Sequence, residues 1–221
     1  MFDANCLKLM FVAGSQDFYH VKGGKNDRIN ALLDTLESAL ESKITAFQFR
    51  QKGDLALQDP VEIKRLALEC QKLCKKYGVP FIINDEVRLV LELKADGVHV
   101  GQEDMAIEEV ITLCKKRQFI GLSVNTLEQA LKARHLDGVA YLGVGPIFPT
   151  QSKKDKQVVG VELLKKIRDS GVKKPLIAIG GITMHNASKL RECGISGIAV
   201  ISAIAQAKDK ALVIEKLLNH A

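Results

Sequence analysis

The feature that most constrains the fold of this chain is a strand-like run followed by a helix-like stretch, repeated eight times along 221 residues. Short apolar runs typical of strands occupy 7–13, 44–49, 79–83, 97–100, 119–122, 139–144, 176–179 and 197–200. Stretches with helical apolar spacing separate them, at 28–40, 60–77, 86–93, 106–116, 127–134, 160–170, 184–192 and 208–219. Strands that alternate with helices in this way are connected by crossovers, so the pattern predicts a parallel sheet.

Two parallel architectures fit such a pattern. Eight strand–helix units within 221 residues suit a compact α/β fold of the (β/α)8 TIM barrel type. A doubly wound open sheet is the alternative, but the glycine fingerprint of dinucleotide binding does not follow the first strand, where 13–17 reads Ala-Gly-Ser-Gln-Asp. We therefore expect one TIM barrel domain that spans residues 1–221.

Composition narrows the partners. The net charge is +6, but the lysines are spread over many predicted helix ends and aromatic residues make up only 5% of the chain, a pattern that argues against nucleic-acid binding. The five cysteines have no disulfide spacing, which indicates reduced thiols in the cytoplasm. The N-terminus shows no signal peptide, and no apolar run reaches the roughly 18 residues of a membrane span. A small anionic substrate is the use of the positive charge that we expect.

The end of the second predicted strand carries a polar cluster. Gln48, Arg50 and Lys52 share one parity, whereas Phe47 and Phe49 share the other. In a barrel, one parity faces the lumen and the other faces the helices, and the phenylalanines suit the helix side. The two cations would then meet at the mouth of the barrel, where an anion must compensate them. A strand end that frays into solvent is the alternative.

Carboxylates follow the next two strands. Asn84 and Asp85 come after the third strand, and Asp104 comes after the fourth. A helix N-cap explains each aspartate by itself. As a pair on adjacent strands, facing Arg50, Lys52 and Lys153, they are better explained as ligands of Mg2+, which binds few carboxylates and bridges phosphate oxygens.

The later strand ends indicate a phosphate site. Gly180 and Gly181 precede Thr183, and Ile201–Ser202 precede the last helix, at the positions where barrels of this type bind phosphate. The loop after the sixth strand would add Thr150, Ser152 and Lys153; a polar loop without function is the alternative. Ser123 ends the fifth strand. His99, on a buried strand, is expected to be a hydrogen-bonded core histidine, and we find no nucleophile–base pair in the sequence. A phosphate cradle apart from a cation-plus-metal site implies two anionic substrates or one bisphosphorylated substrate.

From about residue 31 to residue 207, these motifs resemble the thiamine-phosphate synthase family. Those that carry the resemblance are Gln-Phe-Arg-x-Lys, Ile-Asn-Asp, Gly-Val-His-Val-Gly-Gln-Glu-Asp, Gly-Pro-Ile-Phe-Pro-Thr and Ile-Gly-Gly-Ile-Thr. The family consists of (β/α)8 enzymes that join the pyrimidine and thiazole halves of thiamine. The chain departs from the family at three places. Position 51 is often acidic in the family and is Gln51 here, Ser152 replaces a threonine, and segment 15–30 is longer and more polar than expected.

The resemblance implies a role for each matching residue. The pyrimidine diphosphate would be bound by Gln48, Arg50, Lys52 and Asn84, with Ser123 and Lys153 on the diphosphate. Asp85 and Asp104 would hold Mg2+. The thiazole phosphate would be held by Thr150, Ser152, Gly181, Ile201 and Ser202. By the same resemblance, Phe49, Gln51 and Gln151 belong to the substrate-binding segments, and the residues acting in catalysis would be Arg50, Lys52, Ser123 and Lys153.

The implied reaction expels pyrophosphate from the pyrimidine methylene carbon, and the thiazole nitrogen attacks that carbon. The ring amino group can feed electrons to the methylene carbon, so a dissociative, carbocation-like path is plausible. Positioning and charge stabilisation would drive it without a general base. The expected partners are small molecules, without nucleic acid or membrane, and a homo-oligomer stays open. Two other functions also stay open. A thiazole tautomerase or other isomerase would have lost the metal carboxylates, and a non-catalytic phosphate-binding barrel would have lost its polar strand ends.

Overall fold

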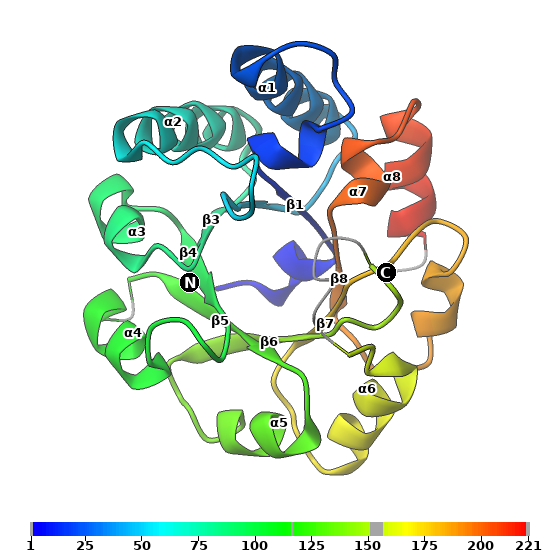
Figure 1. Ribbon diagram of the computed structural model, residues 1–221. Helices are drawn as coiled ribbons and strands as arrows, with labels where there is room; N and C mark the ends of the chain where they lie inside the picture. Colours follow the sequence, from blue (N-terminus) through cyan, green and yellow to red (C-terminus); the bar gives the residue numbers. More distant parts are fainter. Residues whose placement is uncertain (1, 116, 151–156, 220–221) are drawn as a thin grey trace.

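The computed structural model describes residues 2–115, 117–150 and 157–219. Parallel strands form a closed barrel in sequence order, and helices surround it (Figure 1). The strands are β1 (Leu9–Ala13), β2 (Ala46–Phe49), β3 (Phe81–Asn84), β4 (Gly97–Val100), β5 (Phe119–Val124), β6 (Val139–Val144), β7 (Leu176–Ile179) and β8 (Gly197–Val200). The predicted (β/α)8 TIM barrel is therefore confirmed.

Helices occupy the connections between the strands. The α-helices are α1 (Lys25–Glu41), α2 (Pro60–Tyr77), α3 (Val87–Leu93), α4 (Ile107–Cys114), α5 (Leu127–Ala133), α6 (Gly160–Asp169), α7 (Ser202–Ala205) and α8 (Lys210–Leu218). Short 3-10 turns are η1 (Ala4–Leu7), η2 (Ser15–Phe18) and η3 (Ala187–Leu190). Among the described residues, every helix is too short or too polar for the hydrocarbon thickness of a bilayer.

Local chemistry explains where α2 begins and ends. The Asp59 carboxylate accepts a hydrogen bond from the Val61 N–H at 2.9 Å, and Pro60 occupies the first helical position. Gly78 ends the helix in the left-handed conformation, with φ of 68°.

The helix predicted at 184–192 is wrong. Only the 3-10 turn η3 forms there. The Asn186 side chain explains the difference, because its Oδ1 accepts from the Thr183 N–H at 2.8 Å and its Nδ2 donates to the Gly181 carbonyl at 2.9 Å. Side-chain bonds of this kind compete with a regular helix and hold a compact turn instead.

Side chains alternate between two apolar regions. One region lies between the strands and the helices, and it includes Phe47, Phe49, Phe81 and Val100. The other fills the lower lumen with Leu7, Met10, Val12, Ala46, Ile82, Tyr141, Ile177 and Ala199. The N-terminal segment packs against this second region, and Figure 1 shows it in dark blue across the centre of the barrel. Apolar side chains thus fill one end of the lumen, and polar side chains line the other end, where the strands have their carboxyl ends.

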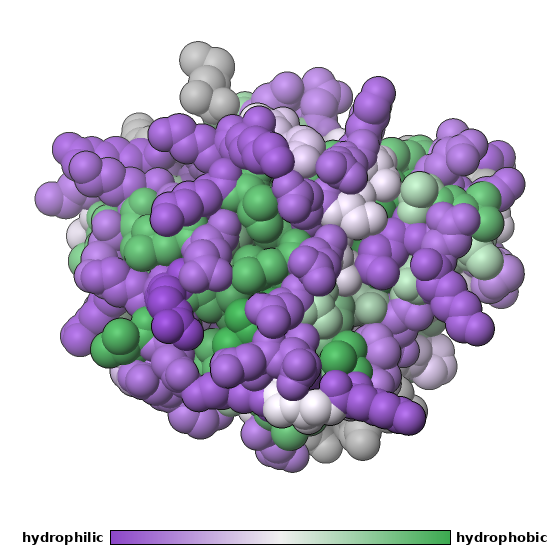
Figure 2. All heavy atoms as spheres, turned by 90° about the horizontal axis from the view of Figure 1, so that it is seen from above, coloured by the Kyte–Doolittle hydropathy of each residue, from purple (hydrophilic) through white to green (hydrophobic). Residues whose placement is uncertain are grey.

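The outer face of the helices is polar. In Figure 2, the molecule is seen from above relative to Figure 1, from the side where α1 and α2 lie. Hydrophilic side chains cover most of this face, and apolar side chains form a band between them. This arrangement follows from the amphipathic helices, which turn one apolar stripe toward the strands.

Candidate active site

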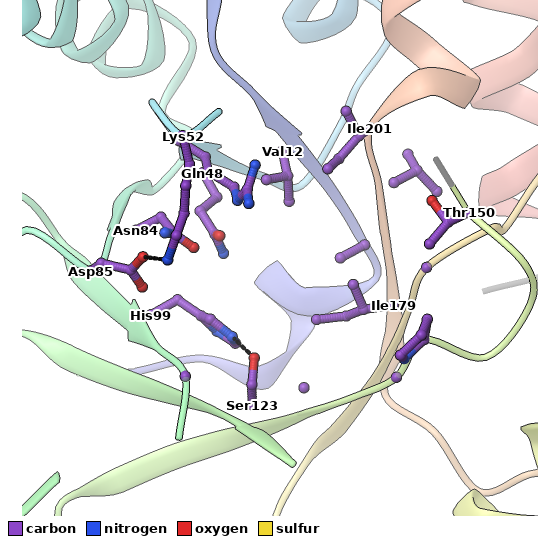
Figure 3. A pocket seen from close by; sticks show the side chains of 18 of the residues that line it. Val12, Gln48, Lys52, Asn84, Asp85, His99, Ser123, Thr150, Ile179 and Ile201 are labelled. Carbon is purple, nitrogen blue, oxygen red and sulfur yellow. Dashed lines mark hydrogen bonds and ion pairs between the residues drawn. The ribbon is translucent and has the colours of Figure 1, made fainter. Parts of the chain in front are cut away.

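A cavity of about 510 Å³ opens at the carboxyl ends of the strands (Figure 3). It brings together most of the predicted site residues that the structure describes, namely Gln48, Arg50, Lys52, Asn84, Asp85, Asp104, Ser123, Thr150, Gly181, Ile201 and Ser202. Because parallel strands all point their carboxyl ends to one rim, residues far apart in the sequence meet there.

Two predicted residues lie outside the cavity lining. The Phe49 side chain is buried among the helix-side apolar residues, as its parity predicts. The Gln51 side chain instead holds the local loop, where its Oε1 accepts from the Ser15 hydroxyl at 3.2 Å and from the Leu57 N–H at 3.0 Å. Gln151, Ser152 and Lys153 lie outside the described residues.

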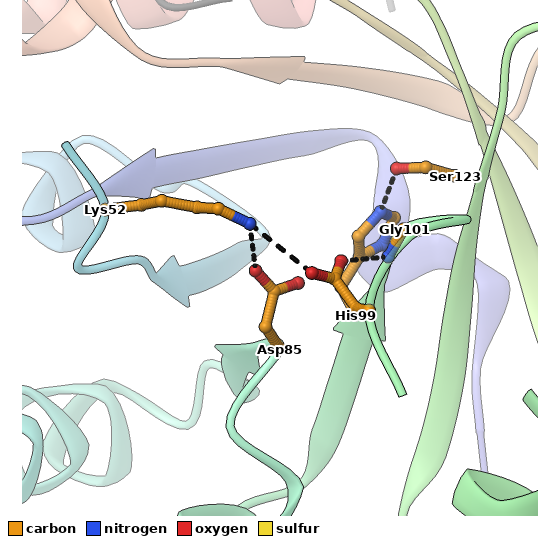
Figure 4. Close-up of polar contacts among 6 residues, drawn as sticks. Lys52, Asp85, His99, Gly101 and Ser123 are labelled. Atoms are coloured by element: carbon orange, nitrogen blue, oxygen red, sulfur yellow. Dashed lines mark hydrogen bonds and ion pairs between the residues drawn. The ribbon is translucent and has the colours of Figure 1, made fainter. Parts of the chain in front are cut away.

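Lys52, Asp85 and Asp104 form one charged cluster (Figure 4). Lys52 Nζ lies 2.8 Å from Asp85 Oδ2 and 3.4 Å from Asp104 Oδ1. Asp104 also accepts a hydrogen bond from the Gly101 N–H at 2.7 Å, which orients its carboxylate. Asp85 has a left-handed backbone, with φ of 63°, a conformation that is uncommon for non-glycine residues and that aspartate adopts more readily than most.

The pKa values of the two carboxyl groups shift in opposite directions. Burial, and then the hydrogen bond and charge of Asp104, raise the pKa of Asp85 above its ordinary value. For Asp104, burial acts in the same direction, but the bonds from Asp85 and the Gly101 N–H and the charge of Lys52 outweigh it and lower its pKa. The hydrogen bond to Asp85 raises the pKa of Lys52, which keeps the ammonium charged. One cation therefore compensates a close carboxylate pair.

This cluster fits Mg2+ on the chemistry of its donors. Within the described ranges, no cluster of three or more His, Cys, Asp or Glu side chains has metal-binding geometry. Two carboxylates suffice for Mg2+, which keeps several waters and completes its shell with substrate phosphates. The Lys52 ammonium pairs with both carboxylates, and Asp85 and Asp104 are the residues that would hold a metal ion.

His99 also belongs to the cavity lining, which the sequence did not predict. It is 4% exposed, and its Nε2 lies 2.8 Å from Ser123 Oγ while its Nδ1 lies 2.9 Å from the Tyr141 hydroxyl. The expectation of a hydrogen-bonded core histidine is confirmed, but the same side chain faces the cavity from β4. The Ser123–His99 contact also pairs a hydroxyl with an imidazole. The sequence alone could not predict this contact, because the two residues lie on different strands.

The opposite side of the cavity is built of glycine and apolar side chains. Gly180 and Gly181 have φ values of 94° and 66°, and a Cβ on Gly181 would lie 2.4 Å from the Pro149 carbonyl oxygen. Only glycine fits both restraints, because the 146–149 segment packs closely against these two residues. Both glycines also line the cavity. Ile179 and Ile201 line the same side beside Thr150 (Figure 3).

The turn after β1 supports Arg50 from outside the cavity. Gln16 Nε2 donates to the Arg50 carbonyl at 2.8 Å and to Asp17 Oδ2 at 2.7 Å, and the Gly14 N–H donates to the same carboxylate oxygen at 2.8 Å. Burial raises the pKa of Asp17 to about 6, against the lowering effect of these bonds and of the Arg50 charge. This explains part of the polar segment 15–30, for which the sequence offered no role.

Comparisons of sequence and of structure with known proteins point to one family. The family described as thiamine monophosphate synthase matches residues 18–204. A thiamine-phosphate synthase of Helicobacter pylori strain HPAG1 is 90% identical over the full length of both chains. One from Pasteurella multocida strain Pm70 is 51% identical and covers 97% of this chain and 96% of its own. The solved structure of a thiamine phosphate pyrophosphorylase from Pyrococcus furiosus superposes with a TM-score of 0.82 at 35% identity, over 98% of this chain and 96% of that one.

Proposed function

Because the chain belongs to the thiamine monophosphate synthase family and is a transferase of thiamine biosynthesis, we propose that it joins 4-amino-2-methyl-5-hydroxymethylpyrimidine diphosphate to thiazole phosphate. The products are thiamine phosphate and pyrophosphate. The observation that supports this proposal is that one cavity has a charged cluster on one side and glycine backbone on the other, which we propose as two anion-binding poles. Arg50 and Lys52 with the carboxylates Asp85 and Asp104 form one pole, and the backbone around Gly181 forms the other.

The residues between and at the poles have separate roles. Gln48, Arg50, Lys52 and Asn84 bind the pyrimidine diphosphate, and Ser123 and Lys153 contact its diphosphate. Thr150, Ser152, Gly181, Ile201 and Ser202 hold the thiazole phosphate, with Gln151 in the same segment. The packing of Phe49 and the loop contacts of Gln51 support indirect roles for those two, as residues that hold the 48–52 segment in place.

The chemistry follows from where the charges lie. The bond between the pyrimidine methylene carbon and the diphosphate oxygen breaks, and its electron pair leaves with pyrophosphate. The thiazole nitrogen lone pair then forms the new bond to that carbon. Arg50, Lys52 and Lys153 stabilise the growing negative charge, and their contacts strengthen as the bond breaks. Mg2+ held by Asp85 and Asp104 would neutralise charge on the same phosphate oxygens.

The other two functions are less well supported. An isomerase or a binding-only barrel explains neither the carboxylate pair, with its lysine 2.8 Å away, nor the polar side chains at the strand ends. The proposal also extends to a single domain over 1–221 and to a cytoplasmic location, which the five free cysteines favour. A homo-oligomer is an open alternative to a monomer.

The test is pyrophosphate release. We expect release only when both substrates and Mg2+ are present, and expect excess chelator to stop it. Asp85→Ala and Asp104→Ala should each nearly abolish turnover while the fold persists, because both lie at the carboxyl rim of the barrel. Asp34→Ala, on the exposed side of α1, is the matched control. Full turnover by either variant, or by the unmodified protein in chelator, would show that the metal assignment is wrong.

A further inference from the structure

Three side chains on consecutive strands form a hydrogen-bonded row that descends from the cavity into the barrel. Ser123 of β5 contacts His99 of β4 at 2.8 Å, and His99 contacts the Tyr141 hydroxyl of β6 at 2.9 Å. The His99 and Tyr141 rings lie 5.5 Å apart between their centroids. Figures 3 and 4 show His99 directed at Ser123.

Glycines make the space for this row. A Cβ on Gly121 of β5 would lie 2.4 Å from the Tyr141 hydroxyl oxygen and 2.5 Å from His99 Nδ1. A Cβ on Gly143 of β6 would lie 2.9 Å from His99 Cε1. Glycine weakens a strand interior and often marks a close approach of other groups. At Gly121 the groups that approach are His99 and Tyr141, and at Gly143 they are Ile179 and His99, so both glycines leave room for the His99 ring.

The apolar surroundings of Tyr141 decide the direction of the hydrogen bonds. Tyr141 is fully buried among Met10, Ile82 and Ile177, and Phe2 stacks on its ring. Within the described ranges, its hydroxyl makes one hydrogen bond, to His99. If the hydroxyl accepted from Nδ1–H, its own proton would be buried without an acceptor, at a cost of about 1–3 kcal/mol. The hydroxyl therefore donates to Nδ1. Burial also raises its pKa well above the ordinary value, so it stays neutral.

That direction fixes the tautomer of His99. A neutral imidazole carries one proton, so an Nδ1 that accepts leaves the proton on Nε2. Nε2–H then donates to Ser123 Oγ, and the hydroxyl proton of Ser123 is directed to acceptors in the cavity. In the opposite tautomer, Ser123 would donate to His99 and present only lone pairs to an anion.

We propose that Tyr141 and His99 are positioning residues that keep Ser123 a hydrogen-bond donor toward the departing diphosphate. The proposal rests on the role of Ser123 at the diphosphate given under "Proposed function". A donor held in this way meets charge that grows during bond breaking, so its effect falls on kcat more than on KM. Neither His99 nor Tyr141 needs to transfer a proton.

The first arm of the test requires no substrate. The ring nitrogens of protein labelled with 15N-histidine are observed by NMR at about pH 8, and His99 is assigned by the signal that His99→Gln removes. We expect the Nε2–H form in the unmodified protein and a loss of that preference in Tyr141→Phe. Tyr77→Phe is the matched control, because the Tyr77 hydroxyl bonds to Glu41 at 3.2 Å, outside the cavity lining. An Nδ1–H form of His99 in the unmodified protein would overturn the inference.

The second arm measures turnover. Tyr141→Phe should lower kcat about tenfold with little change in either KM. The same change in a Ser123→Ala background should have almost no further effect, because the three groups act in series, whereas a merely structural role would make the two losses additive. His99→Gln, which keeps an N–H near Ser123, should retain more activity than His99→Leu.

The two arms separate the failures. Additive losses in the double variant would overturn the positioning role of Tyr141. A wild-type rate in Ser123→Ala would overturn the role of Ser123 at the diphosphate, and with it the catalytic half of the inference, while the tautomer is judged by the NMR arm alone.

Discussion

Lys52 Nζ lies 2.8 Å from Asp85 Oδ2, so the proposed diphosphate-binding cation and the proposed metal ligand neutralise each other in this structure. The Lys52 side chain is 53% exposed, and it reaches both carboxylates from the edge of the cavity. A divalent cation bound as proposed by Asp85 and Asp104 would compete with this ammonium, and the displaced lysine would then be available to a phosphate group. The proposed metal and diphosphate sites would therefore be coupled through one side chain.

Removing the lysine should strengthen metal binding. In Lys52→Met, we expect the affinity for Mn2+, measured by calorimetry without substrates, to rise about tenfold, because the ion no longer competes with a positive charge. Turnover should fall, since the same side chain stabilises the leaving group. Lys64→Met removes an ion pair with Glu92 outside the cavity lining, and it should change neither quantity. Equal Mn2+ affinities for Lys52→Met and the unmodified protein would contradict the competition.

The glycine pole allows a controlled test of the thiazole site. Gly181→Ala places a Cβ within 2.4 Å of the Pro149 carbonyl, so the backbone must shift. We expect the KM for thiazole phosphate to rise tenfold or more, and that for the pyrimidine diphosphate to move much less. Gly171→Ala introduces the same type of left-handed strain, at φ of 80°, without any atom within 4 Å. If Gly181→Ala raises the KM for both substrates equally, and no more than Gly171→Ala does, the thiazole phosphate is not bound at Gly181.

Much of the site could be predicted because it depends on periodicity. The parity of 44–50 separates Gln48, which faces the lumen, from Phe47 and Phe49, which face the helices. The same rule, applied at each strand end, selects Asn84 and Ser123. Every member of this set needs only its position relative to the end of its own strand, and that position is readable one strand at a time.

The rest depends on contacts across strands. Ser123, His99 and Tyr141 come from separate strands, and only the register of the barrel shows that Ser123 lies opposite Gly143 and His99 opposite Gly121. Similarly, nothing in 14–17 announces that the Gln16 amide reaches the Arg50 carbonyl. The helix expected at 184–192 fails for a related reason, because the bonds of Asn186 to its neighbours outweigh its helical spacing.

Lys153 distinguishes charge stabilisation from simple binding, and its prediction rests on the family motif. If its ammonium meets charge that grows on pyrophosphate, Lys153→Ala should lower kcat substantially at saturating substrate and leave KM nearly unchanged. Lys153→Arg should restore part of the rate, because a planar guanidinium replaces a compact charge. Lys154→Ala is the control within the same loop. A slower Lys154→Ala than Lys153→Ala would transfer the role to the neighbour.

Asp17 should make the stability of the fold depend on pH. Burial raises its pKa to about 6, above the value of about 3.9 for an aspartate in an unfolded chain. Between these values the folded form binds more protons than the unfolded form, so the free energy of unfolding falls as pH rises through this window. The charged Asp17 carboxylate thus lowers the free energy of unfolding by on the order of 3 kcal/mol above about pH 6, and this loss is absent below about pH 4.

Asp17→Asn should remove that cost and keep the geometry, since its amide oxygen still accepts from the Gly14 N–H and from Gln16. We therefore expect the variant to gain stability relative to the unmodified protein between about pH 4 and pH 7, by about 3 kcal/mol in urea unfolding. Asp27→Asn is the matched control, because Asp27 accepts from the Gly24 N–H in the same arrangement at an exposed site. Its effect on the free energy of unfolding should be much smaller than that of Asp17→Asn. If the stability difference between Asp17→Asn and the unmodified protein does not change with pH, burial does not raise the pKa of Asp17 in the folded protein.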